Sequence, residues 1–188
     1  MTALRLVRPA AAHVPAYADA LRRGWSPDNV RGQAAAAEQL ARIAEDPEGF
    51  LAAMDDPEAR AGPILLPDGS TVQRLPGITR WLWTDDFCGS IGFRWQPGSA
   101  TLPPHVLGHI GFAVVPWRRG QGLATQALAL MLDEARTRGL PSVEITTTPD
   151  NRASQRVIEA NGGLLVEHFE RVAAYGGGEA LRYRIALG

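Results

Sequence analysis

The sequence contains no lysine, so all 19 of its basic residues are arginine. Together with 20 acidic residues they leave a formal net charge of −1 at pH 7. A chain so close to neutral offers no electrostatic reason to bind nucleic acid or an anionic membrane surface, and we expect neither as a partner. Arginine in place of lysine, with abundant Ala, Gly and Pro, indicates a GC-rich bacterial gene.

Cysteine is nearly absent as well, since Cys88 is the one cysteine in 188 residues. An intrachain disulfide is therefore excluded, and nothing indicates an oxidising compartment. Four scattered histidines with one cysteine make a poor ligand set, so we expect no metal. The N-terminus lacks the apolar run of a signal peptide, and no apolar stretch reaches the roughly 20 residues that span a bilayer. These features predict a cytoplasmic protein.

The patterns that are present predict a single domain over residues 1–188, of the α+β or mixed α/β class. Helices are expected at 11–24, at 31–54 with a break near Asp46 and Pro47, at 120–139 and at 151–163. Strands are expected at 4–9, 78–84, 89–96, 106–115, 143–148, 164–169 and 180–187. The strands from 78 to 115 and the last two strands are expected to pair antiparallel. In the helix at 120–139, Leu123, Ala127, Leu130 and Met131 are expected to share the buried face.

The stretch WRRGQGLATQAL, residues 117–128, places two arginines and two glycines between an apolar strand and a strong helix. A helix beginning at Gly120 would point its first free amide groups out of its N-terminus, where the helix dipole adds partial positive charge. Gly120 and Gly122 would let a phosphate approach the backbone, and Arg118 or Arg119 would add a full charge. The stretch therefore predicts an anion site that a diphosphate fits.

The site is neither a Walker A loop, which needs G-K-[ST], nor a Rossmann fingerprint, because Thr125 holds the third glycine position. The run from Arg119 to Ala124 instead resembles the R/Q-x-x-G-x-G/A loop of the GCN5-related N-acetyltransferases (GNAT family). The segment Asn151-Arg-Ala-Ser154, which opens the next helix, resembles that family's N-x-x-[SA] pattern. The order of elements matches from about residue 72 to 187. The version found here looks most like a bacterial subgroup of unassigned acetyltransferases.

This resemblance implies a GNAT fold, a mostly antiparallel twisted sheet with a splayed pair of parallel strands, here 106–115 and 143–148. It implies that residues 72–187 form the sheet and the acetyl-CoA-binding core, and that residues 1–60 form the acceptor side. Acetyl-CoA is then the co-substrate, and its pantetheine arm lies in the gap. The residues expected to bind it are Val114, Val115, Arg119, Gly120, Gln121, Gly122, Leu123, Ala124, Thr125, Asn151 and Ser154. Val114 would supply a main-chain contact to the arm or an N–H to the thioester oxygen.

Acetyl transfer needs an unprotonated amine, whereas a free primary amine with a pKa near ~10.4 is almost wholly protonated at neutral pH. Many family members use a Glu on the strand before the phosphate loop, but this strand has no carboxylate. His109 is the candidate base, directly or through a water. Many members also use a Tyr to protonate the leaving thiolate, and Ile158 stands at that position. Ser154, Tyr175 or solvent could serve instead.

Structural explanations of the same residues stay open. His109 could be a hydrogen-bonded core histidine, and Asn151 could simply be an N-cap, with or without a ligand. Trp25, Asp28 and Asn29 lie where the acceptor-binding loop should be and could contact a substrate. The segment could equally be an Asx-type turn with a packed Trp. Trp81 and Trp83 are expected in the core, and Cys88 is expected to be a small buried hydrophobe.

Three hypotheses of function follow. The first is an N-acetyltransferase that moves an acetyl group from acetyl-CoA to a primary amine of a small molecule or peptide. The second is a non-catalytic acyl-CoA-binding sensor or regulatory module, motivated by the missing strand carboxylate and by Ile158. The third is an unrelated α/β protein that binds a phosphate ligand. The acceptor is not readable from the sequence, since one fold serves many substrates. A homodimer is expected as the commonest symmetry.

Overall fold

The computed structural model describes residues 2–65, 69–172 and 177–188. Its helices are α1 (Val14–Arg22), α2 (Gln33–Glu45), α3 (Pro47–Met54), α4 (Leu123–Arg136) and α5 (Arg152–Ala160). Its strands are β1 (Arg5–Val7), β2 (Asp55–Asp56), β3 (Ile64–Leu65), β4 (Thr71–Val72), β5 (Gly77–Trp83), β6 (Phe87–Arg94), β7 (Ile110–Val114), β8 (Ser142–Thr147), β9 (Leu164–Glu170) and β10 (Glu179–Ala186). The predicted mixed α/β single-domain class is confirmed.

The strands form two main antiparallel ladders. One has the order β1-β5-β6-β7, with β2 also paired to β5, and the other has the order β8-β10-β9. Strand β7 leads through α4 into β8, and a strand–helix–strand crossover of this kind makes the two strands parallel. Strands β7 and β8 are in contact. No ladder of hydrogen bonds joins them in the described chain, which indicates that they diverge.

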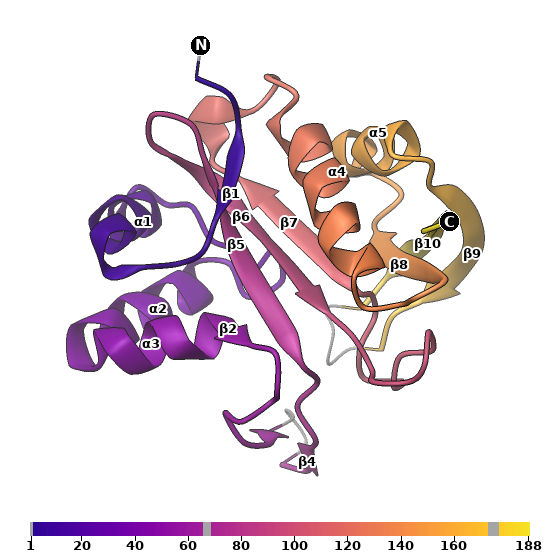
Figure 1. Ribbon diagram of the computed structural model, residues 1–188, viewed down its shortest axis with the longest axis horizontal. Coiled ribbons are helices and arrows are strands. Elements are labelled where there is room, and N and C mark those ends of the chain that lie inside the picture. Colours follow the sequence, from indigo (N-terminus) through magenta and orange to yellow (C-terminus); the bar gives the residue numbers. More distant parts are fainter. Residues whose placement is uncertain (1, 66–68, 173–176) are drawn as a thin grey trace.

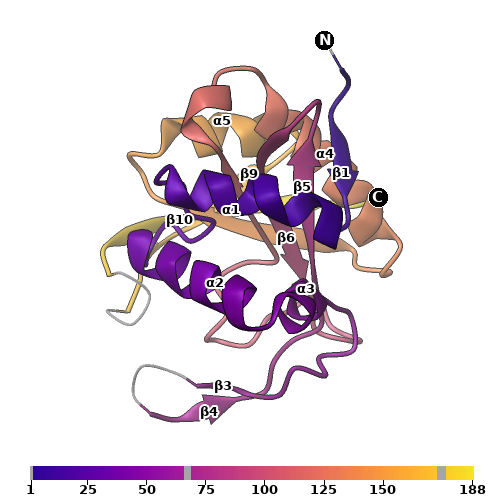
Figure 2. The same cartoon turned by 90° about the vertical axis from the view of Figure 1, so that its left-hand side faces the viewer.

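The helices cover the two faces of the first ladder in separate layers. Helices α1, α2 and α3 pack on one face, while α4 packs on the other with α5 beside it (Figures 1 and 2). Each layer has its own core. On one face lies an aromatic cluster of Tyr17, Trp25, Trp81 and Phe87. On the other face lies a second, mostly aliphatic core, to which Leu128 and Met131 of α4 belong.

Several element boundaries differ from the sequence predictions. The first helix starts as a 3₁₀ turn at Ala11–His13. The expected break in the helix at 31–54 is confirmed at Asp46, whose carboxylate caps α3 by accepting the Gly49 amide. Helix α4 begins at Leu123 rather than at Gly120. In that helix Leu130, which was expected to be buried, is 42% exposed. Leu128, which was not named, is buried in its place.

Strand β7 begins at Ile110 rather than at 106, because the chain at Gly108 and His109 turns toward β8. The short strands β2, β3 and β4 were not expected from the sequence. The antiparallel pairing of β5, β6 and β7, and that of β9 with β10, is confirmed.

Candidate functional site

The turn before α4 carries the groups that the sequence analysis assigned to anion binding. Gly120 and Gly122 have φ of +75° and +72°, a left-handed conformation that favours glycine. This turn is why the helix cannot start at Gly120, as predicted, and starts at Leu123 instead. The amides of Leu123, Ala124 and Thr125 have no intrahelical acceptor, and no described side chain caps them. A Cβ built on Gly120 would meet no described atom within 4 Å, so the approach is open.

The two arginines of the turn have different roles. Arg118 pairs with Asp85 at 3.0 Å and donates to the Thr84 hydroxyl, so its charge is engaged by the β5–β6 hairpin. Arg119 is exposed, and its Nε donates to the carbonyl of Val114 at 3.2 Å. No described carboxylate pairs with Arg119. Arg119 is therefore the cation that remains available to an anion at this turn.

The edge of β7 that faces β8 presents main-chain groups to the gap. The Val115 amide donates to Cys88 of β6, and its carbonyl accepts from the Arg118 amide, so both of its main-chain groups are engaged in the fold. Because alternate residues of a strand direct their peptide groups to opposite edges, those of Val114 and Phe112 point away from β6. Val114 thus keeps a main-chain N–H directed into the gap, as expected, whereas Val115 has none to offer.

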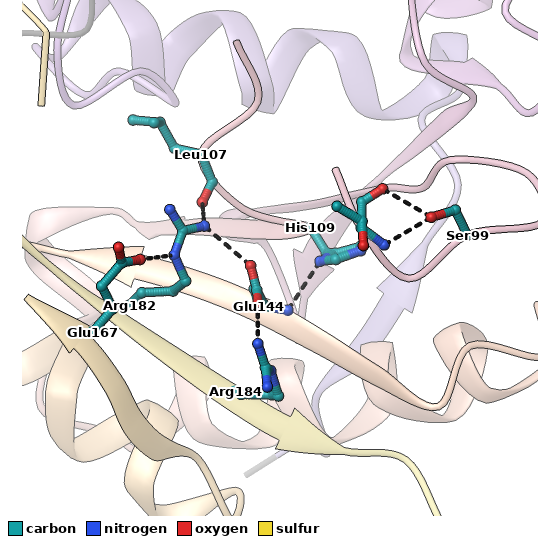
Figure 3. A network of polar contacts seen from close by, with 8 residues as sticks. Ser99, Leu107, His109, Glu144, Glu167, Arg182 and Arg184 are labelled. Atoms are coloured by element: carbon teal, nitrogen blue, oxygen red, sulfur yellow. Dashed lines mark hydrogen bonds and ion pairs between the residues drawn. The ribbon is translucent and has the colours of Figure 1, made fainter. Parts of the chain in front are cut away.

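The two diverging strands touch at His109 and Glu144. The His109 amide donates to the Glu144 carbonyl at 2.7 Å, and the Glu144 amide donates to Nδ1 of the imidazole at 2.9 Å (Figure 3). Below this contact Arg182 pairs with Glu144 and Glu167, and it also donates to the Leu107 carbonyl. Arg184 is the second partner of Glu144, at 2.8 Å. This network fixes the closed end of the gap.

The geometry at His109 does not favour a general base. The ring is fully buried, and its acceptor nitrogen Nδ1 already takes the Glu144 amide, so the neutral ring carries its proton on Nε2. Burial, followed by the neighbouring cations Arg94 and Arg182, lowers the pKa of His109 to about 4 against the opposing effect of Glu144. The hydrogen-bonded core histidine, left open by the sequence, is the arrangement found.

Glu144 is no substitute base. Burial alone would raise the pKa of its carboxyl, but hydrogen bonds from Arg184 and Arg182 outweigh it and hold the pKa below its usual value. The carboxylate therefore stays ionised and paired at neutral pH.

The second sequence motif forms the N-terminus of α5. The Asn151 side chain caps the helix by accepting the Ser154 amide at 3.1 Å, as the structural alternative expected. Ser154 is half-buried and its hydroxyl makes none of the hydrogen bonds found in the described chain. Ile158, at the position where many family members have a proton-donating Tyr, is fully buried in the aliphatic core and cannot donate a proton. Tyr175 lies outside the described residues.

The loop expected to contact the acceptor is mostly a structural turn. Trp25 is only 2% exposed and packs edge-on against Tyr17 and Phe87, which favours the packed-Trp alternative. The Asp28 carboxylate accepts the amides of Val30 and Arg31, as in an Asx-type turn. Asn29 is exposed beside it. Among these three residues, Asn29 is the one whose side chain is not committed to packing or to the turn.

Two grooves lie on the surface of the described chain. The larger, of about 760 Å³, lies between the loop at 100–107 and the second ladder, where Glu144, Arg182 and Arg184 line it. The smaller, of about 240 Å³, lies between the end of α3, β3, the ends of β5 and β6 and the loop at 105–106. Sequence reasoning missed both. The alternation of Arg182 and Arg184 with apolar residues indicates a polar face, but their partners depend on the register of β8 against β10.

Two further features bear on the class of site. Within residues 2–65, 69–172 and 177–188, no group of three or more His, Cys, Asp or Glu side chains is placed to hold a metal ion. Over the same ranges, no helix has the length and apolar character needed to cross a membrane.

Comparison with known proteins gives one family match. The profile of the acetyltransferase (GNAT) domain family matches residues 4–163, which is most of the chain. No curated protein matches the sequence.

Solved structures of several acetyltransferases share the fold. One, from Salmonella typhimurium, is described as modifying the N-terminal serine of ribosomal protein L7/L12; it has a TM-score of 0.65 at 18% identity, over 99% of this chain and 96% of that one. Mycobacterium smegmatis RimJ, solved with a CoA disulfide, has a TM-score of 0.65 at 21% identity, over 97% and 81%. The microcin C7 self-immunity acetyltransferase MccE, solved with acetyl-CoA and AMP, has a TM-score of 0.60 at 11% identity, over 97% and 92%.

Proposed function

Because the chain belongs to the GNAT acetyltransferase family, and is by class an acetyl-CoA-dependent N-acetyltransferase, we propose that it acetylates a primary amine of a small molecule or peptide. The observation that carries the proposal is the open turn at 119–125 beside the gap between β7 and β8. Backbone amides at a helix N-terminus form an anion site, and the diverging strands leave main-chain groups for an extended arm.

The chemical groups of the turn, of β7 and of the start of α5 are those needed to bind coenzyme A. The amides at Gly120, Gln121, Gly122, Leu123, Ala124 and Thr125 and the guanidinium of Arg119 would hold the pyrophosphate. The Val114 N–H would bind the arm or the thioester oxygen, and Asn151 and Ser154 would border the arm from α5. When bound, acetyl-CoA supplies an activated acyl group: the amine nitrogen bonds to the acetyl carbon, the C–S bond breaks, and the amine proton ends on the departing thiol.

The chain's own contribution is then mainly positional. The Val114 N–H is fixed by the β6–β7 ladder, and a fixed donor at developing negative charge is typically worth on the order of 10²–10³ in rate. His109 holds the closed end of the gap. A role for its ring as base would require the hydrogen bond from the Glu144 amide to break. Ser154, half-buried at the start of α5, stays the described candidate for proton donation to the thiolate.

A non-catalytic acyl-CoA-binding module is the second candidate. Two observations favour it: Ile158 fills the core where many relatives have an acid, and the acceptor nitrogen of His109 is occupied. Both functions share the coenzyme site and differ in turnover.

Transfer of labelled acetyl groups separates the two candidates. The protein is incubated with labelled acetyl-CoA and a panel of small amines and short peptides with free N-termini, while thiol release and labelled product are both measured. An acetyltransferase releases thiol and labels an acceptor in equal amounts. Tight calorimetric binding of acetyl-CoA without labelling of any acceptor would count against the enzyme and in favour of the binding module. The acceptor, the expected homodimer and the cytoplasmic location stay predictions.

A further inference from the structure

Cationic and neutral basic side chains outnumber carboxylates in the lining of the smaller groove. Arg74, Arg94 and His105 line it, together with one carboxylate, Asp56. The two oxygens of Asp56 accept the amides of Arg60 and Ala61, so this carboxylate is engaged by its own turn. Arg74 donates to the Gly62 carbonyl at 3.1 Å and lies close to Asp56.

Arg94 is exposed in this groove and has no charged partner among the described residues. Its main-chain amide donates to the His109 carbonyl at 2.9 Å, but its guanidinium makes no ion pair or hydrogen bond with any described residue. The side chain is exposed along the groove, and partial desolvation by its surroundings lowers the pKa of the guanidinium. A partly desolvated cation without a counter-charge is costly unless it meets an anion.

His105 supplies a second unsatisfied group in the same groove. Its Nε2 is buried and has no hydrogen-bond partner in the described part of the chain. An unpaired buried polar atom is costly, so a polar group bound in the groove would stabilise this nitrogen by hydrogen bonding to it.

The groove reaches Gly92 of β6, which is the neighbour of β7 in the sheet. Gly92 of β6 pairs with Gly111 of β7, and alternation places Gly92 on the same face as Arg94. A Cβ on Gly111 would meet no described atom within 4 Å, and one on Gly92 would make only ordinary contacts. Two residues of strand span about 7 Å, so the Arg94 backbone lies about that far along β6 from the Gly92–Gly111 pair.

We propose that the amine acceptor carries a carboxylate a few bonds from its amine, that it enters over the Gly92–Gly111 pair, and that Arg94 with His105 binds this carboxylate. The inference rests on the proposed acetyltransferase function and adds the chemical class of its acceptor. A neighbouring guanidinium also favours the neutral, nucleophilic form of the amine, since like charges disfavour protonation. Arg94 thereby selects the acceptor and eases its deprotonation.

Matched acceptors test this. One arm compares the amidated dipeptide alanyl-aspartate with alanyl-asparagine, and the other compares alanine with alaninamide, so that each pair differs by one carboxylate. We expect kcat/KM to favour the carboxylate acceptor of at least one pair by about 10-fold or more, the effect of one charge-assisted hydrogen bond. The pair that shows the preference tells whether the acceptor resembles an acidic peptide N-terminus or a free amino acid.

The variant Arg94→Gln should reduce that preference to within about twofold while acetyl-CoA binds as in the native protein. The control is Arg5→Gln, since Arg5 is exposed and pairs with Trp83 at the end of β5 farthest from the groove; it should keep the preference. Equal kcat/KM within both pairs, or an equal loss for all acceptors in Arg94→Gln, would overturn the proposal.

Failure of the proposed function looks different, because acetyl-CoA then fails to bind or no acceptor is labelled. If none of these small acceptors turns over, calorimetry with their N-acetylated forms in the presence of coenzyme A gives a second measurement. Tighter binding of the acetylated carboxylate compounds, lost in Arg94→Gln, supports the proposal, and equal affinity overturns it.

Discussion

His109 is a fully buried residue with a titratable ring, so its burial should be visible in how protein stability depends on pH. Its pKa is about 4 in the folded protein and about 6.5 in an unfolded chain. Between these values the unfolded state binds more protons, so the histidine's contribution to stability is complete above pH ~6.5 and is lost as the pH falls toward 4. The difference amounts to on the order of 3 kcal/mol.

The variant His109→Asn keeps an oxygen near the position of Nδ1 to accept the Glu144 amide, but it does not titrate. We expect the free energy of unfolding, measured with urea from pH 7 to pH 4, to fall more steeply for the native protein than for His109→Asn. His109→Leu, which leaves the Glu144 amide unpaired, should be less stable than His109→Asn by about 1–3 kcal/mol at every pH. Parallel pH profiles of the native protein and His109→Asn would contradict the placement of this ring.

For single residues, the sequence named candidates together with alternative structural roles. It gave His109, Asn151 and Trp25 each a structural alternative, and the structure shows the hydrogen bonds or packing that each alternative requires. Arg94 and His105 were missed. An arginine at the end of a strand gives no signal of its own, because its importance depends on a groove built from α3, β3 and a distant loop.

At the scale of elements, the junction between β6 and β7 decides where Val114 lies. Gly89 pairs with Val114, and a Cβ on Gly89 would lie 2.2 Å from the Ala113 carbonyl oxygen and 2.9 Å from the Val114 Cα. Both contacts are with backbone, so β7 would have to move.

We therefore expect Gly89→Ala to destabilise the fold by about 1–3 kcal/mol and to weaken coenzyme A binding as well. Gly92→Ala in the same strand is the control for stability, because its Cβ would lie 3.8 Å from the nearest backbone atom; its free energy of unfolding should stay close to native. Thermal and urea unfolding of both variants provide the measurement. Equal stability of the two variants would show that the Gly89 contact does not hold β7 in place.

Element boundaries show what a sequence pattern can and cannot predict. The period of apolar residues identified α4, β7 and β8 correctly. The starts of α4 and β7 were wrong by three and four residues, because Gly120 and Gly122 adopt a left-handed turn and Gly108 approaches the Glu144 carbonyl closely, whereas β8 starts within one residue of the prediction. Local pattern carries no information on a close approach between segments that are more than 30 residues apart.

At the scale of the whole molecule, two antiparallel ladders meet at one point and enclose the proposed coenzyme site between them. The family resemblance gave this divergence in advance, whereas composition and periodicity alone gave only the mixed α/β class. The ion network of Glu144, Arg182 and Arg184 was not predictable, since it needs the register of three strands at once. The central claim is that the turn before α4 binds the pyrophosphate of coenzyme A through its backbone.

Two glycines at opposite ends of α4 allow this claim to be tested with a matched control. Gly122 has φ of +72° at the N-terminal turn, and Gly139 has φ of +70° beyond the C-terminus. Valine at either position meets the same left-handed strain, about 1–2 kcal/mol, so the two variants should lose similar stability. Only Gly122 lies at the proposed phosphate site.

The decisive measurement is calorimetric titration of acetyl-CoA into the native protein, Gly122→Val and Gly139→Val, with urea unfolding of each as the measure of stability. We expect Gly139→Val to bind acetyl-CoA like the native protein and Gly122→Val to bind it at least about 10-fold more weakly, although both unfold with similar free energies. Equal affinity of the two valine variants would contradict the assignment of this turn to the coenzyme.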